Sequence, residues 1–252
     1  NNPKPMIKFF RRLRFDLMEK NNTGKYIKYA LGEIVLVVIG ILIALQINNW
    51  NEGRKEFKKS KSLLQEFKKD LVLDTVESDY VTAKLEEQVK RESWALRLVF
   101  YDKSQSDSLR KVFFGPYYQQ PVSVRTYTKL QNSENPNLTG FSDLQNELTK
   151  YYIETKYLLD AYNEEEKYYA FENHINQVIR SKVEIDLADF PMLPRDQERA
   201  ELIISYAQTI EGRNYIKENY KRRKSMIRYF KKVKQDAKRL IQLINASLEQ
   251  EK

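Results

Sequence analysis

The chain has 252 residues, a formal net charge of +9, and 41% hydrophobic and 31% charged residues, which suffices for one medium-sized domain and an anchoring segment. It contains no cysteine, which excludes disulfides, thiolate nucleophiles and cysteine-ligated metals. Glycine and proline number only seven each, and the scarcity of both favours long helices over a fold of strands and turns.

The first 28 residues are basic and contain a short amphipathic pattern. Apolar side chains recur at helical spacing at Met6, Phe9, Phe10, Leu13 and Leu17, and basic side chains fill the opposite side at Lys8, Arg11 and Arg12. A basic amphipathic helix of this kind binds an anionic membrane surface. We therefore expect residues 1–28 to form a cytoplasmic helix on the inner leaflet.

An uninterrupted apolar run from Ile34 to Leu45 predicts a transmembrane helix over residues 29–50. With its flanks the run covers about 19 residues, and at ~1.5 Å per residue it spans roughly 28 Å, close to the ~30 Å hydrocarbon core. The aromatic residues at its two ends are expected to anchor it at the interfaces; they are Tyr26, Tyr29 and Trp50.

A buried core helix and a cleaved signal peptide are the alternatives for this run. Clusters of Lys and Arg on both flanks argue against a core helix, and no small-x-small cleavage pattern follows the run, so we expect an uncleaved signal anchor. Six basic residues before the run and five after it barely decide the orientation. The short basic N-terminus favours a bacterial inner-membrane protein with a cytoplasmic N-terminus and the bulk of the chain in the periplasm.

One face of the expected span is suited to contact with another helix. Its members are spaced three and four residues apart: Glu33, Val37, Gly40, Ala44 and Ile47. Gly40 and Ala44 form a small-xxx-small pair, which lets two helix backbones approach closely. Glu33 lies about one turn inside the membrane, where it either reaches back to the headgroups or faces protein. The face predicts a homo-oligomer or a membrane-protein partner.

Several segments of the sequence resemble a known family. These are the start MIKFFRRLR, the block KYIKYALGEIVLVVIGILIALQINNWNE, the following LLQEFKKDL and the later stretch YTKLQNSENPNLTGFSDLQNELTKYY. The anchor block is the most distinctive, and the chain resembles an uncharacterised family of single-span proteins abundant in Bacteroidota. The resemblance implies an inner-membrane anchor with a helical periplasmic domain, and it supplies no catalytic residues.

Residues 51–252 are expected to form an elongated antiparallel helical bundle, so that the whole fold is all-α. Apolar spacing predicts three long helices, which run to about residue 100, over residues 142–179 and through the C-terminal seam from Met226 to Leu248. Shorter helices are expected near residues 109–112, 124–130 and 196–210. Ser142 with Gln145 reads as a capping box, and Gly212 as a C-cap glycine.

Charge is distributed unevenly over this domain. Residues 63–212 carry eighteen basic and twenty-six acidic residues, whereas residues 213–252 carry thirteen and four. The basic helix either packs on the acidic middle or presents a basic surface to an anionic partner. That surface would consist of Arg222, Arg223, Lys224, Arg228, Lys231 and Lys232. No nucleic-acid partner is expected for a periplasmic domain.

The chemistry of an enzyme is not evident in the sequence. The one histidine, His174, has no carboxylate three or four residues away, the glycines are isolated, and the run Glu164–Glu166 is expected to be solvated surface. Of each pair among the seventeen tyrosines, such as Tyr151 and Tyr152, one ring is expected in the core and one at its rim. We expect no cofactor, no metal and no catalysis.

The functional hypothesis is a membrane-anchored scaffold or accessory subunit of a membrane protein complex. The alternative is an extracytoplasmic ligand sensor that acts through a partner transducer.

Overall fold

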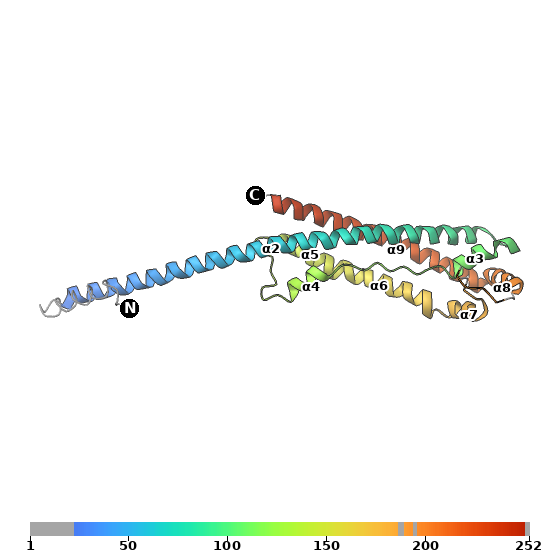
Figure 1. Cartoon of the computed structure of the whole chain (residues 1–252), viewed down its shortest axis with the longest axis horizontal. Coiled ribbons are helices and arrows are strands. Elements are labelled where there is room, and N and C mark those ends of the chain that lie inside the picture. The colour runs from blue at the N-terminus through green and yellow to red at the C-terminus, as the bar shows by residue number, and fades with distance from the viewer. Residues whose placement is uncertain (1–22, 186–188, 194–195, 250–252) are drawn as a thin grey trace. The chain divides into compact units, whose positions relative to one another are not determined.

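The computed structural model describes residues 23–185, 189–193 and 196–249, and all regular secondary structure in these ranges is helical (Figure 1), which confirms the all-α prediction. The α-helices are α2 (Thr23–Arg97), α3 (Ser106–Phe113), α4 (Arg125–Gln131), α5 (Ser142–Lys150), α6 (Lys156–Lys167), α7 (His174–Lys182), α8 (Asp196–Ala207) and α9 (Ile210–Glu249). The amphipathic helix predicted from Met6 to Leu17 lies outside the described residues. The chain divides into an N-terminal unit, residues 1–58, and a bundle unit, residues 59–252.

In the N-terminal unit, the described part of α2 is a single helix whose apolar side chains are exposed. Every residue from Ile34 to Trp50 is exposed, with Leu36 at 68% and Leu42 at 58%. The helix begins before the predicted span and continues to Arg97, three residues short of the predicted end. At this end the backbone tightens, and the amide of Leu98 donates to the carbonyl of Ala95 at 3.2 Å.

In the bundle unit, α9 lies antiparallel to the C-terminal part of α2 (Figure 1). Contacts between the two helices run in opposite sequence directions: Asp79 pairs with Lys234, and Glu92 pairs with Arg223. The interior of this packing contains aliphatic and aromatic side chains from both helices, among them Phe67 of α2 and Phe230 of α9, both fully buried. Burial of such side chains provides most of the free energy that holds helices together.

The helices α5 and α6 form a third long segment, which also runs antiparallel to α9. Glu147 of α5 pairs with Arg239 at 2.5 Å, and Glu166 of α6 pairs with Arg222. The segment is therefore parallel to α2, and α9 is antiparallel to both. The reason is an extended segment that carries the chain back along α2 before α5 begins.

This return segment, residues 115–124, and α4 after it pass along α2 toward lower residue numbers. A Cβ on Gly115 would lie 2.8 Å from the side chain of Gln88, so the segment approaches α2 closely at its start. Farther along, the amide of Ser123 donates to Asp74 at 2.8 Å. In α4, Lys129 pairs with Glu66 at 2.8 Å.

The predicted helix over residues 142–179 is interrupted twice. Five-residue π-helical segments follow α5 (Tyr151–Thr155) and α6 (Tyr168–Glu172). At Asn173 the backbone is extended, and its side chain caps α7 by accepting from the amide of Ile175 at 3.0 Å. An Asn that caps a new helix separates α7 from α6.

The helix start predicted at Ser142 is confirmed, because α5 begins there, but the two predicted caps are wrong. No capping box forms at this start, and Gln145 instead accepts from the amide of Leu138 at 2.7 Å and holds the preceding loop. Gly212 does not end a helix; it lies buried in the first turn of α9, where an added Cβ would be 2.1 Å from the carbonyl oxygen of Tyr206. Glycine is needed there for the close approach of two backbones.

Candidate functional site

The buried face of α2 in the bundle unit is unusually polar. Its buried polar members between residues 70 and 92, named here the polar ladder, are Asp70, Asp74, Ser78, Thr82, Gln88 and Glu92. Most of them alternate with apolar positions such as Leu71 and Leu85, both of which are fully buried. Buried polar groups are costly unless they are hydrogen-bonded. The partners of the ladder therefore show what it holds in place.

Asp70 and Asp74 hold the return segment on α2. Asp70 accepts from the amide of Thr126 at 3.0 Å and forms an ion pair with Arg125 at 2.7 Å. Asp74 accepts from the Ser123 amide and from the Tyr151 hydroxyl, the latter at 2.9 Å. Burial raises the pKa of Asp74 to about 6, against the lowering effect of these two hydrogen bonds.

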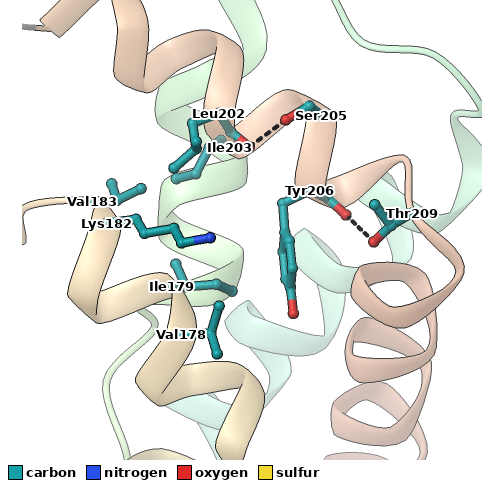
Figure 2. A pocket seen from close by; sticks show the side chains of 9 residues that line it. All are labelled: Val178, Ile179, Lys182, Val183, Leu202, Ile203, Ser205, Tyr206 and Thr209. Atoms are coloured by element: carbon teal, nitrogen blue, oxygen red, sulfur yellow. Dashed lines mark hydrogen bonds between the residues drawn. The ribbon is translucent and has the colours of Figure 1, made fainter.

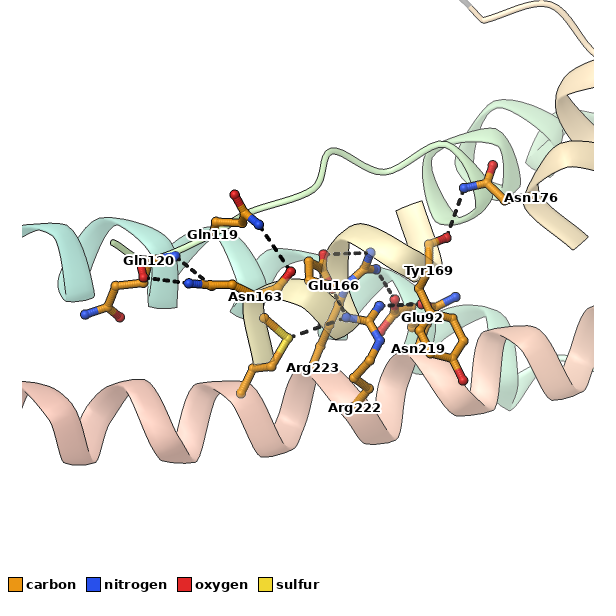
Figure 3. A network of polar contacts seen from close by, with 11 residues as sticks. Glu92, Gln119, Gln120, Asn163, Glu166, Tyr169, Asn176, Asn219, Arg222 and Arg223 are labelled. Atoms are coloured by element: carbon orange, nitrogen blue, oxygen red, sulfur yellow. Dashed lines mark hydrogen bonds and ion pairs between the residues drawn. The ribbon is translucent and has the colours of Figure 1, made fainter. Parts of the chain in front are cut away.

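Four charged side chains meet in the interior between α2, α6 and α9 (Figure 3), and we call them the ion quartet. They are Glu92, Glu166, Arg222 and Arg223, and each is at most 6% exposed. Arg222 pairs with Glu166, Arg223 pairs with Glu92, and Arg223 also lies 3.5 Å from Glu166. The quartet is balanced, with two formal charges of each sign.

Burial dominates the electrostatics of the quartet. It lowers the pKa of Arg222 to about 9, helped by the adjacent positive charge of Arg223. Burial likewise raises the pKa of Glu92, against the lowering effect of Arg223. Removing one partner of such a group would leave a charge with neither water nor a counter-ion, which is strongly destabilising.

Further polar side chains extend the site on both sides of the quartet (Figure 3). Arg222 donates to Asn219 at 2.6 Å, and its guanidinium lies 4.7 Å from the ring centre of Tyr169. Asn163 of α6 bonds the backbone of Gln120 twice, donating at 2.8 Å and accepting at 3.0 Å. These bonds attach the return segment to α6 next to the quartet, which joins α2, α6 and α9.

The prediction of a basic surface on α9 is wrong for Arg222 and Arg223, which face the interior because they follow the phase of the apolar seam. Lys224, Arg228, Lys231 and Lys232 are exposed. Of these, Lys231 lies on the acidic face of α2, 2.7 Å from Glu86.

Two further predictions about polar or aromatic clusters are corrected. Glu166 is fully buried in the quartet, whereas its neighbours Glu164 and Glu165 are exposed as predicted. Tyr151 and Tyr152 are both buried, at 3% exposure each, rather than divided between core and rim. A π-helical segment begins at this pair and alters the angular spacing of the two rings, which contact each other edge to face.

Four of the five residues predicted to contact another membrane helix are exposed on α2. Val37, Gly40, Ala44 and Ile47 are exposed, and a Cβ on Gly40 would meet no atom within 4 Å. Glu33 is partly buried. The prediction that this face contacts a second helix stays a prediction.

The interfacial anchors are partly described. Tyr29 and Trp50 are 55% and 65% exposed, and the side chain of Tyr26 lies outside the described residues. The Arg54 guanidinium lies 5.5 Å from the ring centre of Trp50, which places a cation beside this aromatic residue.

One helix in the described part of the chain, Ile27–Arg97, is long and apolar enough to cross a membrane by length and composition, and none of its most apolar stretch is buried. Among the described residues, no group of three or more His, Asp or Glu side chains is arranged to hold a metal ion. His174 is exposed at the first position of α7.

Comparison with known proteins gives one partial match. Residues 33–110 match a family described as a family of unknown function, DUF6090. The matched range begins at Glu33 and includes the apolar stretch, the polar ladder on α2 and most of α3. No curated protein and no solved structure matches the chain.

Proposed function

We propose that this protein is a membrane-anchored helical scaffold or accessory subunit of a membrane protein complex, without catalytic activity of its own. The observation that carries the proposal is that a single helix, α2, contains both an exposed apolar segment of membrane-spanning length and the polar ladder of the bundle unit. A helix of this kind can join a lipid-embedded contact face to a folded domain. The contact face is Glu33, Val37, Gly40, Ala44 and Ile47.

In this proposal the protein resides in the bacterial inner membrane with its N-terminus in the cytoplasm and its bundle in the periplasm. The chain has no cysteine, so a single added thiol reports its own location. Lys232→Cys places a thiol at an exposed position of α9. Labelling of this thiol by an impermeant maleimide in intact spheroplasts is expected, and protection until lysis would contradict the orientation.

The scaffold role is tested by crosslinking within the membrane. Gly40→Cys lies on the proposed contact face, and Leu42→Cys, two residues farther, lies about 200° around the helix as its control. We expect oxidative or bifunctional crosslinking in native membranes to trap Gly40→Cys in a dimer or in a complex with another membrane protein. Equal products from both positions, or monomer from both, would count against the proposal.

The alternative function is a ligand sensor that acts through a separate transducer. The observation that favours it is a cavity of about 210 Å³ in the bundle unit, between α7 and α8. A ligand that stabilises one arrangement of these helices would shift the population of bundle conformations. The test is whether a small molecule binds there.

A further inference from the structure

The cavity between α7 and α8 is lined mainly by aliphatic side chains (Figure 2). Its walls include Ile179 of α7, Val183 directly after it and Ile203 of α8, all nearly fully buried in the core at this end of the bundle unit. Val178 and Leu202 complete the apolar part of the lining. Apolar walls of this kind favour an apolar ligand group over ordered water.

Of the described residues that line this cavity, one is charged. Lys182, in the last turn of α7, reaches over the cavity toward Tyr206 (Figure 2). Within the described part of the chain, no carboxylate forms an ion pair with its ammonium group, whereas Lys231 and Lys234 on α9 each have such a partner. An anionic group at the opening would complement this charge.

The opposite side of the cavity is less suited to an anion. The carboxylate of Glu211 acts on Tyr206 there and, together with burial, raises the pKa of Tyr206 to about 12, and its negative charge would repel an anionic group. A ligand would therefore place its apolar body between the aliphatic walls and its anionic group at Lys182.

The volume limits the size of the ligand. At about 210 Å³ the cavity is somewhat larger than the ~150 Å³ apolar cavity that holds benzene, and smaller than the ~300 Å³ at which drug-sized sites begin. A single short acyl chain or one ring fits this range. A membrane lipid with two long acyl chains does not.

We propose that this cavity binds a compact amphiphilic carboxylate, namely one short acyl chain or ring carrying a single anionic group, with the carboxylate at Lys182. The biological use of this site rests on the proposed alternative function as a ligand sensor. Ligand binding itself does not depend on the scaffold role. Failure of crosslinking at Gly40 would remove the scaffold role and leave ligand binding intact.

The test is a calorimetric titration of the full chain in phosphatidylcholine nanodiscs with sodium octanoate, with empty nanodiscs subtracted. 1-Octanol serves as the uncharged probe of the same chain length. We expect saturable binding of octanoate, about fivefold tighter than that of octanol, because an exposed ion pair contributes up to about 1 kcal/mol. No saturable octanoate binding at concentrations up to about 10 mM would overturn the proposal.

Two variants and a control separate the parts of the site. Lys182→Met keeps the aliphatic stem and removes the charge, so octanoate should bind this variant no better than octanol does. Leu202→Trp places an indole at the partly exposed edge of the cavity and should abolish binding of both probes. Lys232→Met removes an exposed lysine of α9 and should change neither.

Three outcomes would contradict the inference. If octanoate and octanol bind the unaltered protein equally, the anionic part of the proposal is wrong. If octanoate keeps its preference in Lys182→Met, the carboxylate does not lie at Lys182. If binding survives Leu202→Trp in a variant whose helical circular dichroism is unchanged, the ligand binds elsewhere and the proposal fails.

Discussion

Two stretches of α2 differ in an instructive way. From Ile34 to Trp50, apolar side chains are exposed, whereas from Asp70 to Glu92 several polar and charged side chains are buried. A water-soluble helix would show the reverse pattern at both places. The second stretch is stabilised by a network of hydrogen bonds and ion pairs, and for the first we propose that lipid surrounds the side chains.

The exposed fraction of a side chain therefore does not identify the medium that surrounds it. Leu42 in the first stretch and Leu73 in the second are 58% and 57% exposed, yet we expect one to contact acyl chains and the other water. The difference lies in the neighbouring sequence. Charged residues, such as Asp70 and Asp74, surround Leu73, and none occurs between Glu33 and Trp50.

The largest effect is expected from breaking the ion quartet. Glu166→Gln removes the carboxylate that pairs with Arg222 and contacts Arg223, and leaves positive charge uncompensated in the interior. We expect the free energy of unfolding of the bundle unit to fall by about 3–5 kcal/mol. Urea denaturation of the full chain in nanodiscs, followed by circular dichroism, measures it.

Its matched control is Glu164→Gln, two residues earlier on the same helix. Glu164 is exposed and lies 3.6 Å from Lys167, so its loss should cost at most about 0.5 kcal/mol. Equal effects from the two substitutions would show that the quartet is not buried as described.

The second effect is a pH dependence that arises from Asp74. Its pKa is raised from 3.8 to about 6 in the fold, so the native carboxyl binds protons more tightly than the unfolded one. The contribution of Asp74 to the free energy of unfolding is fully present below pH 3.8 and is lost as the pH rises through about 6. Between pH 4 and pH 7.5 the unaltered chain should lose about 2 to 2.5 kcal/mol more than Asp74→Asn. Parallel pH profiles of the two proteins would contradict the assignment.

The third prediction compares a glycine in the bundle unit with one in the exposed apolar stretch of α2. An added Cβ at Gly212 would lie 2.1 Å from the backbone of Tyr206, whereas at Gly40 it would meet nothing within 4 Å. Gly212→Ala should therefore destabilise the bundle unit by about 1–3 kcal/mol. Gly40→Ala should leave its unfolding unchanged within about 0.5 kcal/mol. A stable Gly212→Ala variant would show that α8 and α9 do not approach so closely.

The smallest effect concerns the exposed basic face of α9. Lys231 pairs with Glu86 at the surface, where the two side chains are 56% and 44% exposed. Water and salt screen such a pair, so Lys231→Gln should cost no more than about 1 kcal/mol, and less at high salt. A loss as large as that of Glu166→Gln would mean that surface charges, rather than the quartet, hold α9 in place.

The sequence predicts the helical class and the apolar segment because both depend on local composition and periodicity. It also places α4 within about one residue, from the apolar spacing between two breaks. The return segment was not predicted, so neither was the parallel arrangement of α5–α6 and α2. That arrangement depends on contacts such as Ser123 with Asp74, which join residues far apart in the chain.

The buried charges were missed for a related reason. Glu166 and Arg223 each stand in a run of like charges, which normally indicates solvated surface. Their phase carried the signal: Glu166 lies seven residues after the buried Leu159, and Arg223 lies seven before the buried Phe230. A charge in phase with an apolar seam indicates a buried partner of opposite sign, although the sequence does not identify that partner.

The most direct test of the central claim is to ask which solvent surrounds the two equally exposed leucines. Leu42→Cys and Leu73→Cys each place a single thiol in a chain without cysteine, and each protein is labelled in nanodiscs with a water-soluble maleimide. We predict rapid labelling at residue 73 and protection at residue 42 until the disc is dissolved in sodium dodecyl sulfate. Equal labelling of the two positions would show that water, rather than lipid, surrounds the apolar stretch of α2.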